Sequence, residues 1–305
     1  MRSFHSFLFF FILFTGCAKT IKPQQLLKDV QELSADKYKG RKSGTAENKL
    51  AAEYIINRFK EIGLNTYLNN YKKPFTFKDR SGKAIEGTNL IGYIPGKKQD
   101  AIVISAHYDH VGIINGEIFN GADDNASGVG GLLSIAQYFS NNHPEHTLVF
   151  AAFDAEESGL EGAKAFVANP PLEFDCIKLN VNMDMISRSD KNELYAAGTW
   201  HYPLLRAHVT NTNPNIKILF GHDNPKLGKE DWTNQSDQGA FHAKKIPFLY
   251  FGVEDHSDYH KPTDDYNRIN KEFYQNAVKA ILEAIQNIDK SVTIQKIFRD
   301  KLIMH

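Results

Sequence analysis

Four continuous apolar runs, each followed by polar residues, constrain the fold of this 305-residue chain more than any other feature. The runs occupy 101–106, 147–153, 177–183 and 246–251. Apolar runs of this length without alternation are typical of strands that are buried on both faces of a sheet. Apolar residues at helical spacing occupy 46–62, 129–139, 161–168 and 271–288. We therefore predict an α/β fold in a single domain, with a mixed, mostly parallel central sheet and helices on both of its faces.

The composition agrees with one folded domain and excludes several classes of protein. Hydrophobic residues make up 42% and charged residues 24%, which argues against disorder. Lys and Arg total 36 and so do Asp and Glu, so the chain lacks the basic field of a nucleic-acid-binding protein. Short β-type runs on both sides of Asp79-Arg80-Ser81-Gly82 predict a hairpin at one edge of the sheet. We place the folded domain at 31–290, followed by a C-terminal tail at 291–305.

The first residues resemble an export signal rather than part of the fold. A weakly basic start precedes a wholly apolar run at 7–14, which is too short to cross a bilayer as a mature helix. Thr15-Gly16-Cys17 follows and resembles a bacterial lipobox, which implies cleavage before Cys17 and acylation of its thiol. An ordinary secretory signal or a hydrophobic anchor is the alternative, and all three interpretations place the folded part outside the cytoplasm.

The lipoprotein interpretation divides the N-terminal region in two. Residues 1–16 are then a lipoprotein signal peptide, and residues 17–30 are a tether between the lipid and the folded domain. We expect the protein in the cell envelope, lipid-anchored on the outer face of a membrane. The second cysteine, Cys176, is then expected to be unpaired and buried.

Polar side chains that can bind metals follow all four apolar runs. Ligands of open α/β sheets bind beyond the carboxyl ends of the strands, so we expect these side chains to meet there. They are His107 and Asp109 after the first run, Glu156 and Glu157 after the second, Asp184 after the third, and His256 and His260 after the fourth. Taken alone, His107 is explained better by a structural role, whereas Asp184, an acid between two methionines in a buried strand, is expected to be paired or to bind a metal.

Two further patterns favour a catalytic or metal-binding role over a purely structural one. An acidic loop with glycine at both ends, Gly121-Ala-Asp-Asp-Asn-Ala-Ser-Gly128, precedes the helical pattern at 129–139. Helix capping accounts for one acidic residue there but not for an adjacent pair beside small residues. Glu156 and Glu157 are adjacent at a strand end, so their side chains diverge, and one can bind a metal while the other faces a substrate.

These patterns together resemble the bacterial leucyl aminopeptidase and aminopeptidase Y family of co-catalytic di-zinc exopeptidases. Glutamate carboxypeptidases and animal glutaminyl cyclases are related to that family. The resemblance implies a phosphorylase/hydrolase-like fold and a secreted metallopeptidase that acts on peptides, most simply as an aminopeptidase. It is carried, in the family's order, by His-Tyr-Asp (107–109), the acidic loop (121–128), Glu-Glu-Ser-Gly-Leu-Glu-Gly-Ala (156–163), Asn-Met-Asp-Met (182–185) and Tyr-His-Lys-Pro-Thr-Asp (259–264).

The resemblance also implies a set of metal ligands. Two Zn²⁺ ions are expected, bridged by Asp123. One ion adds His107 and Asp184, and the other adds Glu157 and His260. Each ion then has one imidazole, one terminal carboxylate and the shared carboxylate, with a position left open.

Three further roles follow from the same resemblance. Glu156 is the implied general base, Asp109 is the implied partner of His107, and a cis peptide bond is implied after Asp123. His256 is a rival ligand, and His260 is favoured because the Tyr-His-x-Pro pattern centres on it. A carboxypeptidase, which needs a cation for the substrate carboxylate, a one-zinc glutaminyl cyclase and a non-catalytic binding module remain alternatives, and the oligomeric state stays open.

Overall fold

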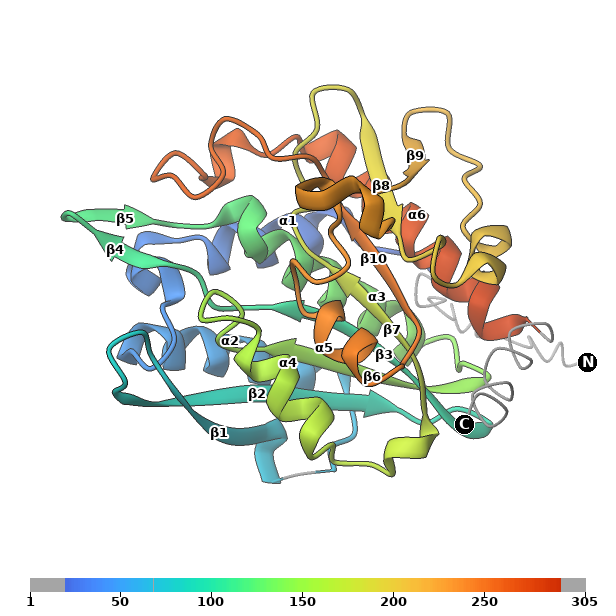
Figure 1. The fold of residues 1–305 in the computed structure, drawn as a ribbon, viewed down its shortest axis with the longest axis horizontal. Coiled ribbons are helices and arrows are strands. Elements are labelled where there is room, and N and C mark those ends of the chain that lie inside the picture. The colour runs from blue at the N-terminus through green and yellow to red at the C-terminus, as the bar shows by residue number, and fades with distance from the viewer. Residues whose placement is uncertain (1–19, 68, 292–305) are drawn as a thin grey trace, which may run out of the picture.

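An eight-stranded mixed sheet forms the centre of the computed structural model, which describes residues 20–67 and 69–291 (Figure 1). The expected signal peptide, the lipidation site Cys17 and the tail beyond residue 291 lie outside the described residues. In order across the sheet, the strands are β1 (Lys72–Lys78), β2 (Ala84–Ile94), β6 (His146–Phe153), β3 (Lys98–His107), β7 (Ile177–Met183), β10 (Phe248–Gly252), β8 (Glu193–Ala197) and β9 (Lys217–Phe220). Two short strands, β4 (Gly112–Ile114) and β5 (Glu117–Phe119), pair separately.

The four predicted apolar runs form the middle of this sheet. Strand β3 pairs in parallel with β6 and β7, and β10 pairs in parallel with β7. The predicted hairpin is present as β1 and β2, which pair in antiparallel fashion. Strand β2 also pairs antiparallel with β6 and so joins the hairpin to the sheet. Parallel pairing brings the carboxyl ends of β3, β6, β7 and β10 to one edge, as the α/β prediction requires.

Helices cover both faces of the sheet. Successive side chains of a strand point to opposite faces, so alternate residues contact different helices. Ile102 and Ile104 of β3 belong to a large core, and the alternate Val103 belongs to a smaller one. The large core also contains buried residues of α1 (Pro23–Leu33), α2 (Ala46–Ile62), α3 (Gly128–Ser140) and α6 (Lys271–Lys290). The smaller core contains residues of α4 (Glu161–Ala168) and α5 (Gln238–Ala243).

The expected tether needs a correction, because helix α1 begins at Pro23 and residues 23–30 belong to the folded domain. Leu26, Val30 and Leu33 are fully buried, at spacings of four and three residues that place them on one helix face. Cys176 is half-buried rather than buried, and it forms no disulfide among the described residues. Within residues 20–67 and 69–291, no helix combines the length and the hydropathy that spanning a bilayer requires.

Candidate metal centre

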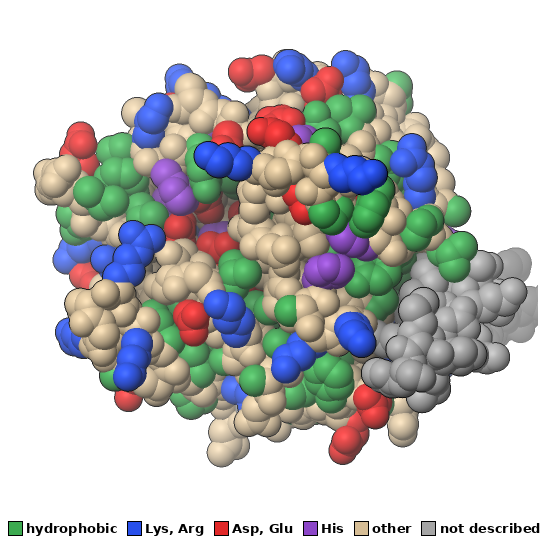
Figure 2. All heavy atoms as spheres, viewed as in Figure 1, with side chains coloured by type: hydrophobic (Ala, Val, Ile, Leu, Met, Phe, Trp, Pro, Cys, Tyr) green, Lys and Arg blue, Asp and Glu red, His purple; other side chains and the backbone are tan. Residues whose placement is uncertain are grey.

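Acidic and histidine side chains gather in a hollow at the carboxyl ends of the central strands (Figure 2). The cavity there has a volume of about 440 Å³. Its wall includes Glu156 and Glu157 after β6, Asp184 after β7, and His260 in the loop after β10. The structure thus brings together polar residues from segments far apart in the sequence, at the edge where they were expected.

The first donor group contains His107, Asp184 and one oxygen of Asp124. The His107 ring ends β3, and its Nε2 atom lies 3.2 Å from Asp184 Oδ1 and 3.4 Å from Asp124 Oδ1. His107 is 1% exposed and Asp184 is 8% exposed, so this group is shielded from bulk water. The Glu156 carboxylate belongs to the same cluster of potential ligand atoms.

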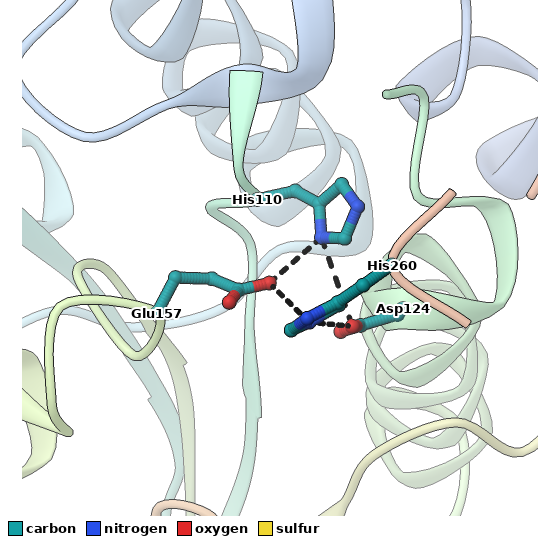
Figure 3. Close-up of side chains that lie close together, drawn as sticks. All are labelled: His110, Asp124, Glu157 and His260. Atoms are coloured by element: carbon teal, nitrogen blue, oxygen red, sulfur yellow. Dashed lines mark ion pairs between the residues drawn. The ribbon is translucent and has the colours of Figure 1, made fainter. Parts of the chain in front are cut away.

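The second donor group contains His260, Glu157, His110 and the other oxygen of Asp124 (Figure 3). His260 Nε2 lies 3.0 Å from Asp124 Oδ2 and 3.3 Å from Glu157 Oε1. His110 Nδ1 lies 2.8 Å from Glu157 Oε1 and 3.7 Å from Asp124 Oδ2. Burial alone would lower the pKa of His260, but the two carboxylates outweigh it and raise the pKa to about 10.

Asp124, not Asp123, is the carboxylate that faces both groups, which corrects the expectation from the acidic loop. Adjacent side chains diverge, and that of Asp123 is directed elsewhere. Asp123 Oδ1 accepts hydrogen bonds of 2.7 Å from both the amide and the hydroxyl of Ser187. Asp123 Oδ2 lies 3.0 Å from His256 Nε2, so the rival His256 is also turned away from the centre. The cis peptide bond likewise falls one residue later than expected, between Asp124 and Asn125.

Buried polar groups behind the centre hold the loops that carry it. The carboxylate of Asp264, in the motif after His260, accepts hydrogen bonds of 2.9 and 3.1 Å from the Asp123 amide and of 3.0 Å from the Asp124 amide. Burial raises the pKa of Asp264 to about 6. The Arg41 guanidinium, which is 1% exposed, donates to the backbone carbonyls of Asn120 and Gly121 at the start of the acidic loop and of Tyr108 after β3. These contacts fix where the Asp124 carboxylate points.

Asp109 positions two neighbours rather than one. Its carboxylate accepts hydrogen bonds from the backbone amides of Glu156, at 3.0 Å, and Glu157, at 3.4 Å. His107 Nδ1 lies closer to the Asp109 backbone carbonyl, at 3.2 Å, than to its carboxylate, at 3.7 Å. The expected contact between Asp109 and His107 is therefore present, mainly through the backbone. Asp109 also ties the loop after β6 to the loop after β3.

Glu156 is a carboxyl group with a strongly perturbed acidity. Burial raises its pKa well above the ordinary value, and Asp184, Asp237 and Glu157 add to this while His107 opposes it. A carboxyl group with a raised pKa beside a donor cluster has the properties required of a general base or acid.

Sequence reasoning missed two residues of this region, His110 and Asp237. His110 comes three residues after His107. A second histidine so close to a predicted metal ligand is the signal that could have identified it. Asp237 is fully buried, and neither of its carboxylate oxygens has a hydrogen-bond partner among the described residues. Burial raises the pKa of Asp237 to about 8. No pattern in the sequence marked it.

The donor chemistry of the two groups fits zinc. Imidazole nitrogens and carboxylate oxygens are common zinc ligands, with bonds of about 2.0–2.2 Å. Donor atoms around one such ion lie about 3.3 Å apart in a tetrahedral arrangement, and the distances in both groups lie around that value. His110 Nδ1 and Glu157 Oε1 are buried and lack hydrogen bonds from the described residues, as expected of atoms directed at an ion.

Comparisons with known proteins point in the same direction. Residues 89–285 match the model of Peptidase family M28. The Escherichia coli alkaline phosphatase isozyme conversion protein is 26% identical over 188 residues, which cover 57% of this chain and 54% of that protein. Aminopeptidase YwaD of Bacillus subtilis is 29% identical over 249 residues, covering 75% of this chain and 52% of that protein. The chain thus spans about half the length of these two curated relatives.

Solved structures share the fold at low sequence identity. A zinc aminopeptidase from Bacillus subtilis, BSAP, superposes with a TM-score of 0.71 at 17% identity, covering 90% of this chain and 97% of that one. A Bacteroides thetaiotaomicron glutaminyl cyclase superposes with a TM-score of 0.68 at 17% identity, covering 88% and 98%. These likenesses establish the single-domain fold with its mixed sheet, and they place an aminopeptidase and a cyclase on the same scaffold.

Proposed function

Because this chain belongs to peptidase family M28, which its match over residues 89–285 shows, we propose that it is a zinc-dependent exopeptidase that releases residues from the amino end of peptides. One observation carries the proposal above the others. The Asp124 carboxylate presents Oδ1 to His107 and Oδ2 to His260, so two donor groups share one side chain. This is the arrangement that a pair of metal ions requires.

We propose that two zinc ions occupy these groups. Asp124 takes the bridging role first expected of Asp123, His107 and Asp184 complete one site, and Glu157 and His260 contribute to the other. When bound, a pair of zinc ions supplies an acidified water and a Lewis acid for the scissile carbonyl. A glutaminyl cyclase, in contrast, works with one zinc, so the number of ions at saturation separates the two activities.

Glu156 is the group that moves the proton. Its carboxylate lines the cavity within the cluster that also holds His107 and Asp184, and it is free of the metal when Asp124 completes that site. It takes a proton from the attacking water and delivers it to the leaving amine. Asp109 is a positioning residue, because its carboxylate binds the backbone amides of Glu156 and Glu157 and thereby fixes where both side chains begin.

The charge of the cavity supports cleavage at the amino end. Of the carboxylates on its wall, Asp124, Glu157 and Asp184 are balanced by the proposed ions, which leaves Glu156 to favour a cationic amino group over an anionic terminus. A substrate that enters with its amino end first places the first peptide bond beside Glu156.

One observation favours a second candidate, a carboxypeptidase. Arg80 at the tip of the β1–β2 hairpin lines this cavity, and it also lines a neighbouring cavity of about 480 Å³ that includes Lys42. A carboxypeptidase needs such a cation for the substrate carboxylate. The hairpin was predicted from the sequence, but the approach of its tip to the active-site cavity was not.

A peptide panel decides between these functions. The purified protein is assayed with free peptides, with N-acetylated peptides and with C-terminal amides, while bound zinc is measured by elemental analysis. An aminopeptidase cleaves the free and amidated peptides and spares the acetylated ones. Cleavage of acetylated peptides together with loss of activity on amides identifies a carboxypeptidase, and the release of ammonia from N-terminal glutamine identifies a cyclase. Absence of any product from the zinc-loaded protein contradicts the proposed catalysis.

We also propose that the protein is a lipoprotein of the cell envelope, anchored through Cys17. The apolar run at 7–14 and the Thr15-Gly16-Cys17 sequence support this proposal. Cells that express the chain are fed a labelled fatty acid, and label is expected on the wild-type protein but not on Cys17→Ser. If the wild-type protein carries no label, the anchor is excluded while the peptidase proposal is unaffected.

A further inference from the structure

We infer that His110 is a direct ligand of the second ion, so that this ion is held by two imidazoles and two carboxylates. The inference rests on the proposed two-zinc function and adds to it a ligand that the sequence motifs do not include. His110 lies in the loop after β3, is 1% exposed, and faces His260 across the space between Asp124 and Glu157 (Figure 3).

The distances carry the first step of the argument. The four edges that join the two imidazoles to the two carboxylates measure 2.8, 3.0, 3.3 and 3.7 Å. A tetrahedral zinc with bonds near 2.0–2.1 Å requires donor atoms about 3.3 Å apart. The His110 Nδ1 atom therefore stands where a fourth corner of the tetrahedron belongs.

The orientation of the atoms carries the second step. His110 Nδ1 and Glu157 Oε1 are 2.8 Å apart, yet both are buried atoms without a hydrogen bond among the described residues. A donor and an acceptor in a hydrogen bond point at each other, and here they do not. Two buried polar atoms that form a close ion pair without the geometry of a hydrogen bond are explained when both are turned toward a third atom between them.

The surrounding backbone carries the third step, because it is shaped to admit the His110 ring. Gly121 has φ +56°, and a Cβ atom there would lie 2.6 Å from His110 Cδ2. That Cβ would also lie 2.1 Å from the backbone oxygen of Asp124. Glycine at the start of the acidic loop thus lets the Asp124 loop and the His110 ring approach the same point.

Zinc affinity tests the assignment without reference to activity. Zinc is titrated into wild-type protein, His110→Ala and His110→Asn in competition with a chromophoric chelator, and circular dichroism verifies the fold of each variant. The exposed His143 provides a matched control, His143→Ala. Loss of a residue that only orients a ligand weakens zinc binding about 10–100-fold. We therefore expect a loss of more than about 100-fold for one of the two ions in the His110 variants, and no change in the control.

Counting imidazoles gives a second, independent measurement. X-ray absorption of the zinc-loaded wild-type protein is expected to show three imidazoles shared by two ions, and His110→Ala is expected to show two. Unchanged zinc affinity or an unchanged imidazole count in His110→Ala overturns the inference.

The outcomes also separate this inference from the proposed function. A wild-type protein that binds zinc as described but cleaves no peptide refutes the function and leaves the ligand assignment standing. If the wild-type protein binds a single ion, the two-zinc proposal fails. The assignment of His110 then depends on that ion alone: loss in His110→Ala supports it, and retention refutes it.

Discussion

Arg41 is a buried cation that holds the loops around the metal centre. Replacing it tests quantitatively how much these contacts contribute to stability and to zinc binding. Its guanidinium donates to the carbonyls of Tyr108 at 2.8 Å, Leu33 at 2.7 Å, Asn120 at 2.6 Å and Gly121 at 3.0 Å. One side chain thus joins the end of α1, the loop after β3 that carries His110, and the start of the acidic loop. Burial lowers the pKa of Arg41 to about 10, so the group stays charged at neutral pH.

The size of the effect follows from these four contacts. Arg41→Met leaves three buried carbonyl groups without a donor, since the Gly121 carbonyl still accepts from the Ala126 amide at 3.2 Å, and each of the three costs about 1–3 kcal/mol. Removing the guanidinium also removes its desolvation penalty of several kcal/mol, which opposes that loss. The balance is a decrease of about 3–5 kcal/mol in the free energy of unfolding, as is found when a buried charged network is broken. Arg41→Lys keeps the charge but not the planar fork, so an intermediate decrease is expected.

Urea denaturation followed by circular dichroism measures this decrease, first with a chelator and then with saturating zinc. Arg58→Met is the matched control, because Arg58 is also buried but pairs with Asp29, with Nε 3.0 Å from Oδ1. Both variants should lose stability, but only Arg41→Met should also bind zinc more weakly. An unfolding free energy of Arg41→Met within about 1 kcal/mol of wild type would refute the reasoning.

Three further predictions follow from individual side chains. Glu156→Gln should keep its zinc and its fold but lose about 10²–10⁴-fold in kcat, because a general base acts in the transition state; steady-state kinetics beside zinc analysis measures this. Asp124→Ala should lose both ions together in an elemental analysis, whereas a role for Asp124 in one group alone predicts the loss of one. Asp289→Asn should cost about 1–3 kcal/mol of stability at neutral pH, since the Asp289 carboxylate accepts hydrogen bonds from the amides of Glu145, at 2.9 Å, and His146, at 2.8 Å. Burial alone would raise the pKa of Asp289, but the His146 ring and these amides outweigh it and hold the pKa below the ordinary 3.8. The stabilisation is therefore complete above pH 3.8 and is lost as the pH falls through the lower folded-state value. Acid denaturation curves should consequently converge for wild type and Asp289→Asn at low pH, and a constant gap between them contradicts this account.

The centre of the fold could be predicted from the sequence because its signals are strong and local. Continuous apolar runs can be satisfied only by burial on both faces, and the glycine after the helix at 46–62, Gly63, has the φ of +81° that favours a C-cap glycine. Strands β8 and β9 were missed because they have only five and four residues, and β9 forms the edge of the sheet, where none of its residues is buried. Helix α1 was assigned to a tether because its apolar face has only three fully buried residues, too few to outweigh the export signal that precedes it.

The site shows a different limit. His107, Glu157, Asp184 and His260 could be named because strand ends and motif order place them, and the structure brings all four to the cavity region. The choice between Asp123 and Asp124 could not be made by pattern, because adjacent residues of the same type differ only in the direction of their side chains. That direction is set by partners distant in sequence, the Ser187 amide above all.

The order of the strands has a consequence for how this chain responds to damage. The two donor groups draw on the ends of β3, β6 and β7, on the acidic loop and on the loop after β10, so no contiguous part of the chain contains either group. An ion that binds only when all of these segments are in place stabilises the native state by mass action. It adds little stability to a partly folded state, because that state lacks some of the ligands. Zinc should therefore protect peptide bonds throughout the domain from proteases, including bonds far from the centre, because cleavage of those bonds requires the same global opening.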